Sequence, residues 1–140
     1  MIIVDSDIWI DFFDNKENTE TKELGYLLRN KIDVGSNSII FIEVTQGLLD
    51  DKEYQRGNHI LSTFKIYPIY NETILKAGEI FRTCQRGIKA KEGTIKGKTL
   101  KTSDCIIASS CIENDLPLFS RDKHFKMMHE FFPQLKIYKG

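Results

Sequence analysis

Two acidic residues stand just after apolar segments of the chain, at positions where a carboxylate can meet a ligand. Asp5 follows the run Ile2–Val4, and Asp122 follows the pair Leu118–Phe119 after two intervening residues. In an open parallel sheet, ligands bind beyond the carboxyl ends of the strands. If both apolar segments are strands, Asp5 and Asp122 are candidates for binding or catalysis.

Two further acids lie against apolar sequence, where a charge is costly to remove from water. Glu43 interrupts the segment 39–44, and Asp104 immediately precedes the apolar run 105–108. Each of the four acids taken alone has an ordinary structural explanation, such as starting a helix, shaping a turn or pairing with a lysine. The four acids together call for a shared explanation, because a fold gains nothing from clustered negative charge.

Carboxylates that converge on one place require a compensating positive charge. Two carboxylates about 4 Å apart repel each other by about 4 kcal/mol at an effective dielectric constant of 20. The sequence has no cluster of histidines and cysteines with metal-ligand spacing, so the expected ion is a hard one that prefers oxygen, Mg²⁺ or Mn²⁺. Such a site suits hydrolysis of a phosphodiester. We interpret the three histidines as surface or packing residues: His59, His124 and His129.

Apolar patterns typical of strands and of helices alternate along the chain and predict the elements that position these acids. Strands are expected at residues 2–4, 32–35, 65–69, 116–120 and 135–138, with helices between them. We expect Ser38 to cap one helix and Thr102 or Ser103 to cap another. Residues 87–101 carry three glycines and five lysines and are expected to form a loop. The alternation predicts one α/β domain with a mainly parallel sheet and helices on both faces.

The composition fits a single folded domain in the cytoplasm. The chain has 140 residues, of which 41% are hydrophobic and 29% charged. Its longest apolar runs have four residues, far below the roughly 18 that a membrane span needs, and acids at positions 5 and 7 interrupt the place of a signal peptide. Three cysteines without a C-x-x-C pair predict buried thiols and no disulfide framework.

A basic segment follows the middle of the chain. Residues 82–101 contain seven lysines and arginines and one acid, although the whole chain has 20 basic and 20 acidic residues. Such a segment is either a solvated surface or a place that meets the phosphates of a polyanion beside the acidic pocket.

Four segments resemble the motifs of PIN-domain ribonucleases, in particular the VapC toxins of bacterial toxin–antitoxin pairs. They are Ile3–Asp11, Glu43–Gly47, Thr102–Ser109 and Leu118–Phe125. The segments follow the family's order, and the resemblance extends over essentially the whole chain. The resemblance implies a five-stranded sheet of order 3-2-1-4-5 and a metal-dependent endoribonuclease that cleaves RNA. It also implies a cognate antitoxin protein as partner and a homodimer.

The resemblance assigns roles to the four acids one position at a time. Asp5, Glu43, Asp104 and Asp122 match the acidic quartet with which the family holds Mg²⁺ or Mn²⁺. On this basis Asp5 and Asp104 are the principal metal ligands. Glu43 and Asp122 orient water at the metal or hold a second ion.

Two alternatives to the ribonuclease stay open, and one of them involves position 7, which departs from the family pattern. Asp7 stands where a small polar residue is usual, whereas Ser6 and Ser120 match the family's hydroxyl positions. The segment 5–8 also resembles the nucleophile loop of haloacid-dehalogenase-type phosphatases, in which the first aspartate attacks phosphorus and the second is the acid. That alternative uses Asp5 and Asp7 but gives Glu43 no role. The other alternative is a PIN-like module that binds RNA or a protein without cutting.

Overall fold

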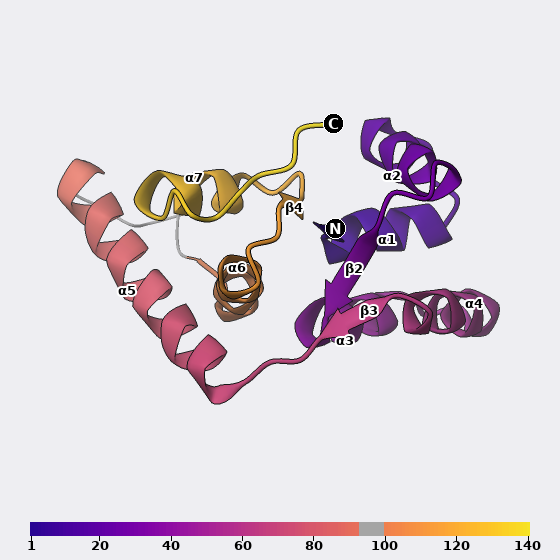
Figure 1. The fold of residues 1–140 in the computed structure, drawn as a ribbon, viewed down its shortest axis with the longest axis horizontal. Coiled ribbons are helices and arrows are strands. Elements are labelled where there is room, and N and C mark those ends of the chain that lie inside the picture. Colours follow the sequence, from indigo (N-terminus) through magenta and orange to yellow (C-terminus); the bar gives the residue numbers. More distant parts are fainter. Residues whose placement is uncertain (93–99) are drawn as a thin grey trace.

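Strands and helices alternate along most of the chain, as the apolar patterns predict. The computed structural model describes residues 1–92 and 100–140, and Figure 1 shows its elements. In chain order they are β1 (Ile2–Val4), α1 (Ser6–Phe13), α2 (Thr19–Arg29), β2 (Val34–Asn37), α3 (Ser38–Gly47), α4 (Asp51–Ser62), β3 (Lys65–Tyr67), α5 (Asn71–Glu92), α6 (Thr102–Glu113), β4 (Leu118–Phe119) and α7 (Lys123–Phe131).

The described strands form one parallel sheet in the order β3-β2-β1-β4. Ile3 of β1 pairs with Gly35 of β2 on one side and with Leu118 of β4 on the other. Because all neighbours are parallel, the carboxyl ends of the strands meet at one edge of the sheet, where ligands bind in such folds. The α/β class and the parallel sheet are therefore confirmed.

The prediction of a fifth strand at residues 135–138 is wrong, because only one residue of that segment pairs. Ile137 forms an isolated parallel bridge with Leu118. The Leu118 N–H donates to the Lys136 carbonyl and the Tyr138 N–H donates to the Leu118 carbonyl, each at 2.9 Å. β4 itself has two residues, Leu118 and Phe119, and one of them, Leu118, makes the bridge. The described residues therefore form an isolated bridge beside β4 and no fifth strand.

Helices cover both faces of the sheet, as expected. α5, α6 and α7 pack together on one side of the strands, and α1 packs against α2, α3 and α4 on the other (Figure 1). The core of the second layer is aromatic: the buried rings of Trp9 and Phe13 stack at 5.7 Å, and Phe64 lies 5.6 Å from Trp9. Burying each such side chain stabilises the folded state by about 1.5–3 kcal/mol. This packing keeps α1 in place next to the end of β1.

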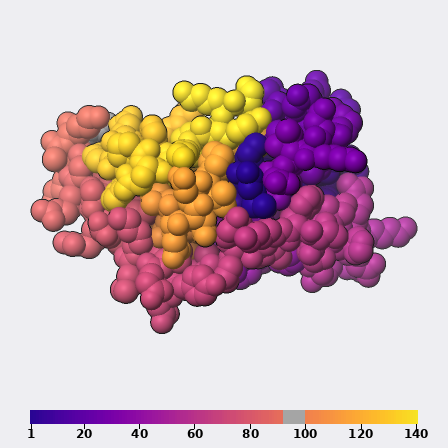
Figure 2. Space-filling view, viewed as in Figure 1, coloured from indigo at the N-terminus to yellow at the C-terminus, as the bar shows by residue number. Residues whose placement is uncertain are grey.

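α5 is longer than the sequence patterns predict, because tertiary packing extends it from about residue 86 to Glu92. Ile88 is buried, and a Cβ atom at Gly87 would overlap the ring of Phe131 in α7. The prediction that the loop begins at residue 87 is therefore wrong. Residues 93–99 of that predicted loop lie outside the described residues. In the space-filling view α5 forms an outer edge of the molecule (Figure 2).

Two helices start differently from the predicted caps. Asn37, and not Ser38, caps α3, because its side-chain oxygen accepts a hydrogen bond from the Ile40 N–H at 2.9 Å. α6 begins after Lys101, whose side chain makes no capping bond, so the predicted caps Thr102 and Ser103 both lie inside the helix. The first backbone N–H groups of α6 consequently have no side-chain cap from that position.

The three cysteines are free and buried, as the sequence predicts. Burial raises the pKa of Cys84 to about 11 and that of Cys105 to about 12, so neither thiol is activated. Within the described part of the chain, no helix combines the length and the apolar character that crossing a membrane requires.

Candidate active site

The carboxylate of Asp5 is held at the end of β1 by hydrogen bonds to both of its oxygens. Oδ1 accepts from the backbone N–H of Ser6 at 2.8 Å, and Oδ2 accepts from the hydroxyl of Ser120 at 2.7 Å. The parallel pairing of Val4 with Phe119 places Ser120 beside Asp5. Asp5 is buried and also caps α1, so its position depends on both the sheet and the helix.

Glu43 reaches the same edge of the sheet from α3. The register of β1 and β2 places Asn37, the cap of α3, level with Asp5. Glu43 lies midway along α3 and is half-buried, and its Oε1 accepts a hydrogen bond from the Ser6 hydroxyl at 3.2 Å. Ser6 therefore links Glu43 to Asp5 by bonding to both carboxylates.

Asp104, Asp122 and His124 meet where α6 and α7 begin. Asp122 caps α7 by accepting from the His124 backbone N–H at 2.9 Å, and the Nδ1 of His124 lies 3.0 Å from the same carboxylate oxygen. One ligand atom from each of the three side chains lies within 4.8 Å of the other two. Asp104 is buried, and among the described residues its Oδ2 has no hydrogen-bond partner.

Burial and mutual repulsion shift the titration of the two buried carboxyls. Desolvation raises the pKa of Asp5 to about 6, although the bonds from Ser120 and Ser6 oppose the shift. Desolvation likewise raises the pKa of Asp104 to about 7, and the negative charges of Asp122, Asp5 and Glu43 raise it further. The negative charges of the other acids therefore add to the cost of ionising Asp104.

The chemistry of this cluster fits a hard divalent cation. A buried acceptor without a donor, such as Oδ2 of Asp104, costs about 1–3 kcal/mol or more, and a cation would satisfy it. Carboxylate oxygens are the ligands that Mg²⁺ and Mn²⁺ prefer. Within residues 1–92 and 100–140, Asp104, Asp122 and His124 are the one group of three potential ligands this close together. Asp5 and Glu43 lie outside that group and contribute negative charge beside it.

The position of His124 was not anticipated from the sequence. The sequence does contain one signal for this contact: His124 lies two residues after Asp122. The second residue of a helix lies close to the capping residue, which here is Asp122. Asp7 is exposed on the first turn of α1, and its charge raises the pKa of Asp5. The hydroxyl positions Ser6 and Ser120 both bond to the acids of the site.

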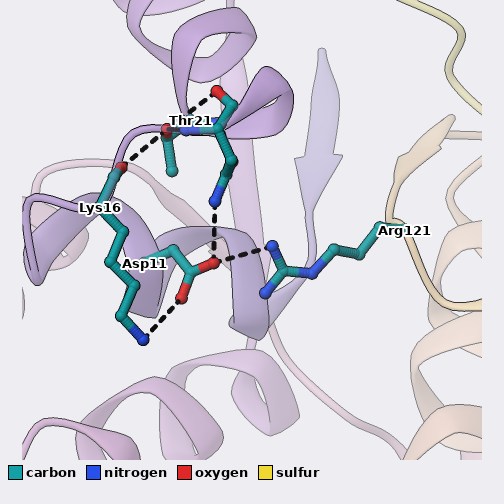
Figure 3. Close-up of polar contacts among 5 residues, drawn as sticks. Asp11, Lys16, Thr21 and Arg121 are labelled. Atoms are coloured by element: carbon teal, nitrogen blue, oxygen red, sulfur yellow. Dashed lines mark hydrogen bonds and ion pairs between the residues drawn. The ribbon is translucent and has the colours of Figure 1, made fainter.

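An ion pair beside the site ties the loop before α7 to α1. Nη1 of Arg121 lies 2.8 Å from Oδ2 of the buried Asp11, which also accepts from Asn18 at 3.1 Å, and Lys16 lies 3.7 Å from Oδ1 (Figure 3). Burial alone would raise the pKa of Asp11, but the hydrogen bond and charge of Arg121 outweigh it and lower the pKa. The pair thereby fixes the residues on either side of Arg121 against α1.

Arg121→Ala is expected to lower the free energy of unfolding at pH 7 by about 1–2 kcal/mol, because it leaves the buried Asp11 charge with weaker partners. A lowered folded-state pKa stabilises the protein above the unfolded value of 3.8, so the difference from the unsubstituted protein should shrink as the pH falls below that value. Urea unfolding at pH 3 and pH 7 measures both effects. Lys136→Ala removes an exposed pair and is the control, with an expected change near zero. Equal effects of the two substitutions would contradict the assignment.

The fold and the site together define an α/β protein with a cluster of buried and half-buried acids at the carboxyl edge of a parallel sheet. The family model of the PIN domain matches residues 2–130, which is most of the chain. The chain belongs to the PIN domain family, as the four motifs indicated. This membership places it outside the haloacid-dehalogenase-type phosphatases. No curated protein sequence matches the chain.

Solved structures with the same fold come from toxin–antitoxin complexes. A chain of VapBC2 from Rickettsia felis, solved bound to a DNA fragment from their promoter, matches with a TM-score of 0.66 and 21% identity over 99% of this chain and 98% of that one. A toxin–antitoxin complex from Klebsiella pneumoniae matches with a TM-score of 0.61 and 22% identity over 100% of both chains. FitAcB from Neisseria gonorrhoeae matches with a TM-score of 0.64 and 20% identity over 99% and 97%. The structural neighbours are thus toxins of the VapC and FitB type.

Proposed function

We propose that the protein is a metal-dependent endoribonuclease and the toxin of a toxin–antitoxin pair. In this proposal Asp5, Glu43, Asp104 and Asp122 hold Mg²⁺ or Mn²⁺ beside the scissile phosphodiester. The observation that carries it is the buried carboxylate of Asp104, which has an unpartnered oxygen and lies among three other acids at the carboxyl edge of the sheet. A fold of this size gains no stability from such an arrangement unless a cation compensates it.

The side chains have separate tasks in this proposal. When bound, the cation supplies Lewis-acid chemistry to the phosphodiester and to the attacking water. Asp5 is fixed by Ser6 and Ser120, so it presents its charge in one orientation. Ser6 orients Glu43 through its hydroxyl. The carboxyl of Asp104, whose pKa is raised to about 7, is partly protonated near neutral pH without the cation and loses its proton when the cation compensates the charge.

The proposed partners are a cognate antitoxin protein and a second copy of the chain. One protein of the same fold was solved in a complex described as a toxin–antitoxin complex, and two others were solved as VapBC proteins bound to DNA. Their identities of 17–22% to this chain support the fold, and the partner is inferred from it. A toxin that cuts RNA would act in the cytoplasm, where its antitoxin is made.

The test is RNA cleavage by the purified protein with and without divalent cations. We expect cleavage inside the strand with Mg²⁺ or Mn²⁺ and none in excess EDTA, and we expect Asp7→Asn to keep the activity. Cleavage that persists in EDTA would contradict the metal dependence. RNA binding without cleavage under any metal condition would favour the non-cutting module.

A further inference from the structure

An apolar groove of about 430 Å³ runs between α5 and α6, close to the proposed active site. The two helices are antiparallel neighbours, because the hydroxyl of Ser109 donates to the carbonyl of Thr73 at 2.8 Å while Arg82 and Thr102 line the same groove further along. The lining side chains are mostly apolar, with one basic residue; the main ones are Ile74, Gly78, Phe81, Arg82, Thr102 and Ile106. A groove of this size takes a nucleoside-sized group.

Gly78 keeps this groove open. A Cβ atom built at Gly78 would meet nothing within 4 Å, whereas one at Gly57 would crowd Leu48 and one at Gly87 would overlap Phe131. A glycine inside a helix costs about 1 kcal/mol relative to alanine. Internal packing explains the glycines at 57 and 87 but not the one at 78. A group that approaches the surface of α5 at Gly78 would explain it.

A row of exposed basic side chains continues from the groove along the same face of α5. Arg82, Arg86 and Lys89 follow Gly78 at spacings of three and four residues, which place side chains above one another on a helix. The basic end of the groove lies at the start of α6. There Thr102 and Cys105, which line the groove, flank Asp104 in the first turn of α6.

We propose that this face of α5 and α6 holds the RNA strand beside the site, with one nucleobase in the groove and successive phosphates on Arg82, Arg86 and Lys89. This inference rests on the proposed function. Binding of single strands combines a cationic track for the backbone with an apolar or aromatic surface on which a base stacks. The groove supplies Phe81 as that surface, and the row supplies the charges. Charge complementarity favours RNA as the occupant, because the face of α5 beyond Gly78 carries exposed basic side chains and the RNA backbone is anionic.

The phosphate track is tested by the salt dependence of RNA binding in EDTA, where cleavage does not occur. The probe is a single-stranded RNA of 20 nucleotides. Each phosphate contact contributes about 0.7 to the slope of log K against log salt concentration. We expect the combined variant Arg82→Ala, Arg86→Ala and Lys89→Ala to flatten the slope by about 2. The control variant Lys22→Ala, Arg29→Ala and Lys52→Ala removes the same charge from α2 and α4, and its slope should not change.

The base site is tested by Gly78→Leu, which places a bulky side chain at the groove; its Cβ atom would meet nothing within 4 Å. We expect it to weaken binding of the RNA by about tenfold or more, the effect of losing one stacked base, and to leave binding of an abasic oligonucleotide of the same length unchanged. Ser62→Leu places an exposed leucine on α4, away from the proposed RNA face of α5 and α6, and should change neither affinity. The proposal of a base in the groove would be overturned if Gly78→Leu binds RNA normally but no longer binds a partner protein or no longer forms a dimer.

The outcomes separate this inference from the proposed function. If the unsubstituted protein binds and cleaves RNA but the triple variant keeps its salt slope, the track is overturned and the nuclease stands. The opposite result is also informative. If the unsubstituted protein binds RNA but never cuts it, and the triple variant flattens the salt slope of binding, the phosphate track is supported and the proposed nuclease activity is contradicted.

Discussion

Asp104→Asn is expected to reduce RNA cleavage by more than about a hundredfold, which exceeds the effect of changing groups that merely support a metal ligand. Asparagine keeps the size of the side chain but removes the charge from a buried oxygen that has no hydrogen-bond partner. The rise in melting temperature on adding Mn²⁺ should shrink as well. Metal binding to the folded state alone contributes about 2.7 kcal/mol at a hundredfold excess over Kd.

The stability of this variant separates a metal ligand from a structural residue. Without a divalent cation at pH 8, Asp104→Asn should be at least as stable as the unsubstituted protein, because a desolvated and repelled charge is gone. Asp33→Asn changes an exposed acid and is the control, with unchanged cleavage and melting temperature. Full cleavage by Asp104→Asn would contradict the proposed role, and so would a marked loss of metal-free stability.

The metal-free protein should lose about 3–4 kcal/mol of unfolding free energy between pH 5 and pH 8 through Asp5 and Asp104. Both folded-state pKa values are raised, to about 6 and about 7, above the unfolded value of 3.8. Between those values the folded state binds more protons, so stability is greater at low pH and falls as the pH rises through the folded pKa values. One pKa unit corresponds to about 1.4 kcal/mol, and the coupled carboxyls share the total.

Urea unfolding in EDTA at pH 5, 6, 7 and 8 measures this dependence. Asp104→Asn should remove more than half of the slope, since it eliminates the larger of the two shifts. Mn²⁺ should flatten the slope in the unsubstituted protein, because a bound cation keeps the carboxylates charged at lower pH. An identical slope in Asp104→Asn would show that other groups cause it.

Much of the fold follows from local sequence patterns. The short apolar runs at residues 2–4 and 118–119 are too short and too abruptly ended for buried helices, and they form the adjacent strands β1 and β4. The patterns also placed most helices within a few residues. They could not show that α5 continues to Glu92, because the buried side of that last turn depends on Phe131, some forty residues away. Nor could they show that residues 135–138 pair at one residue only, since this depends on where β4 ends.

For the candidate site, as for the fold, the sequence identified the residues and the tertiary structure determined how they are arranged. The sequence alone singled out Asp5, Glu43, Asp104 and Asp122, because acids that follow strands or interrupt apolar runs are unusual for a local and physical reason. Only the tertiary structure shows that His124 lies beside Asp104 and Asp122. It also shows that the hydroxyls of Ser6 and Ser120 hold the carboxylates of Glu43 and Asp5 by hydrogen bonds. These contacts join residues up to 115 positions apart, and the packing of α6 against α3 and α7 helps to set their distances. Local spacing along a chain carries no information about such distances.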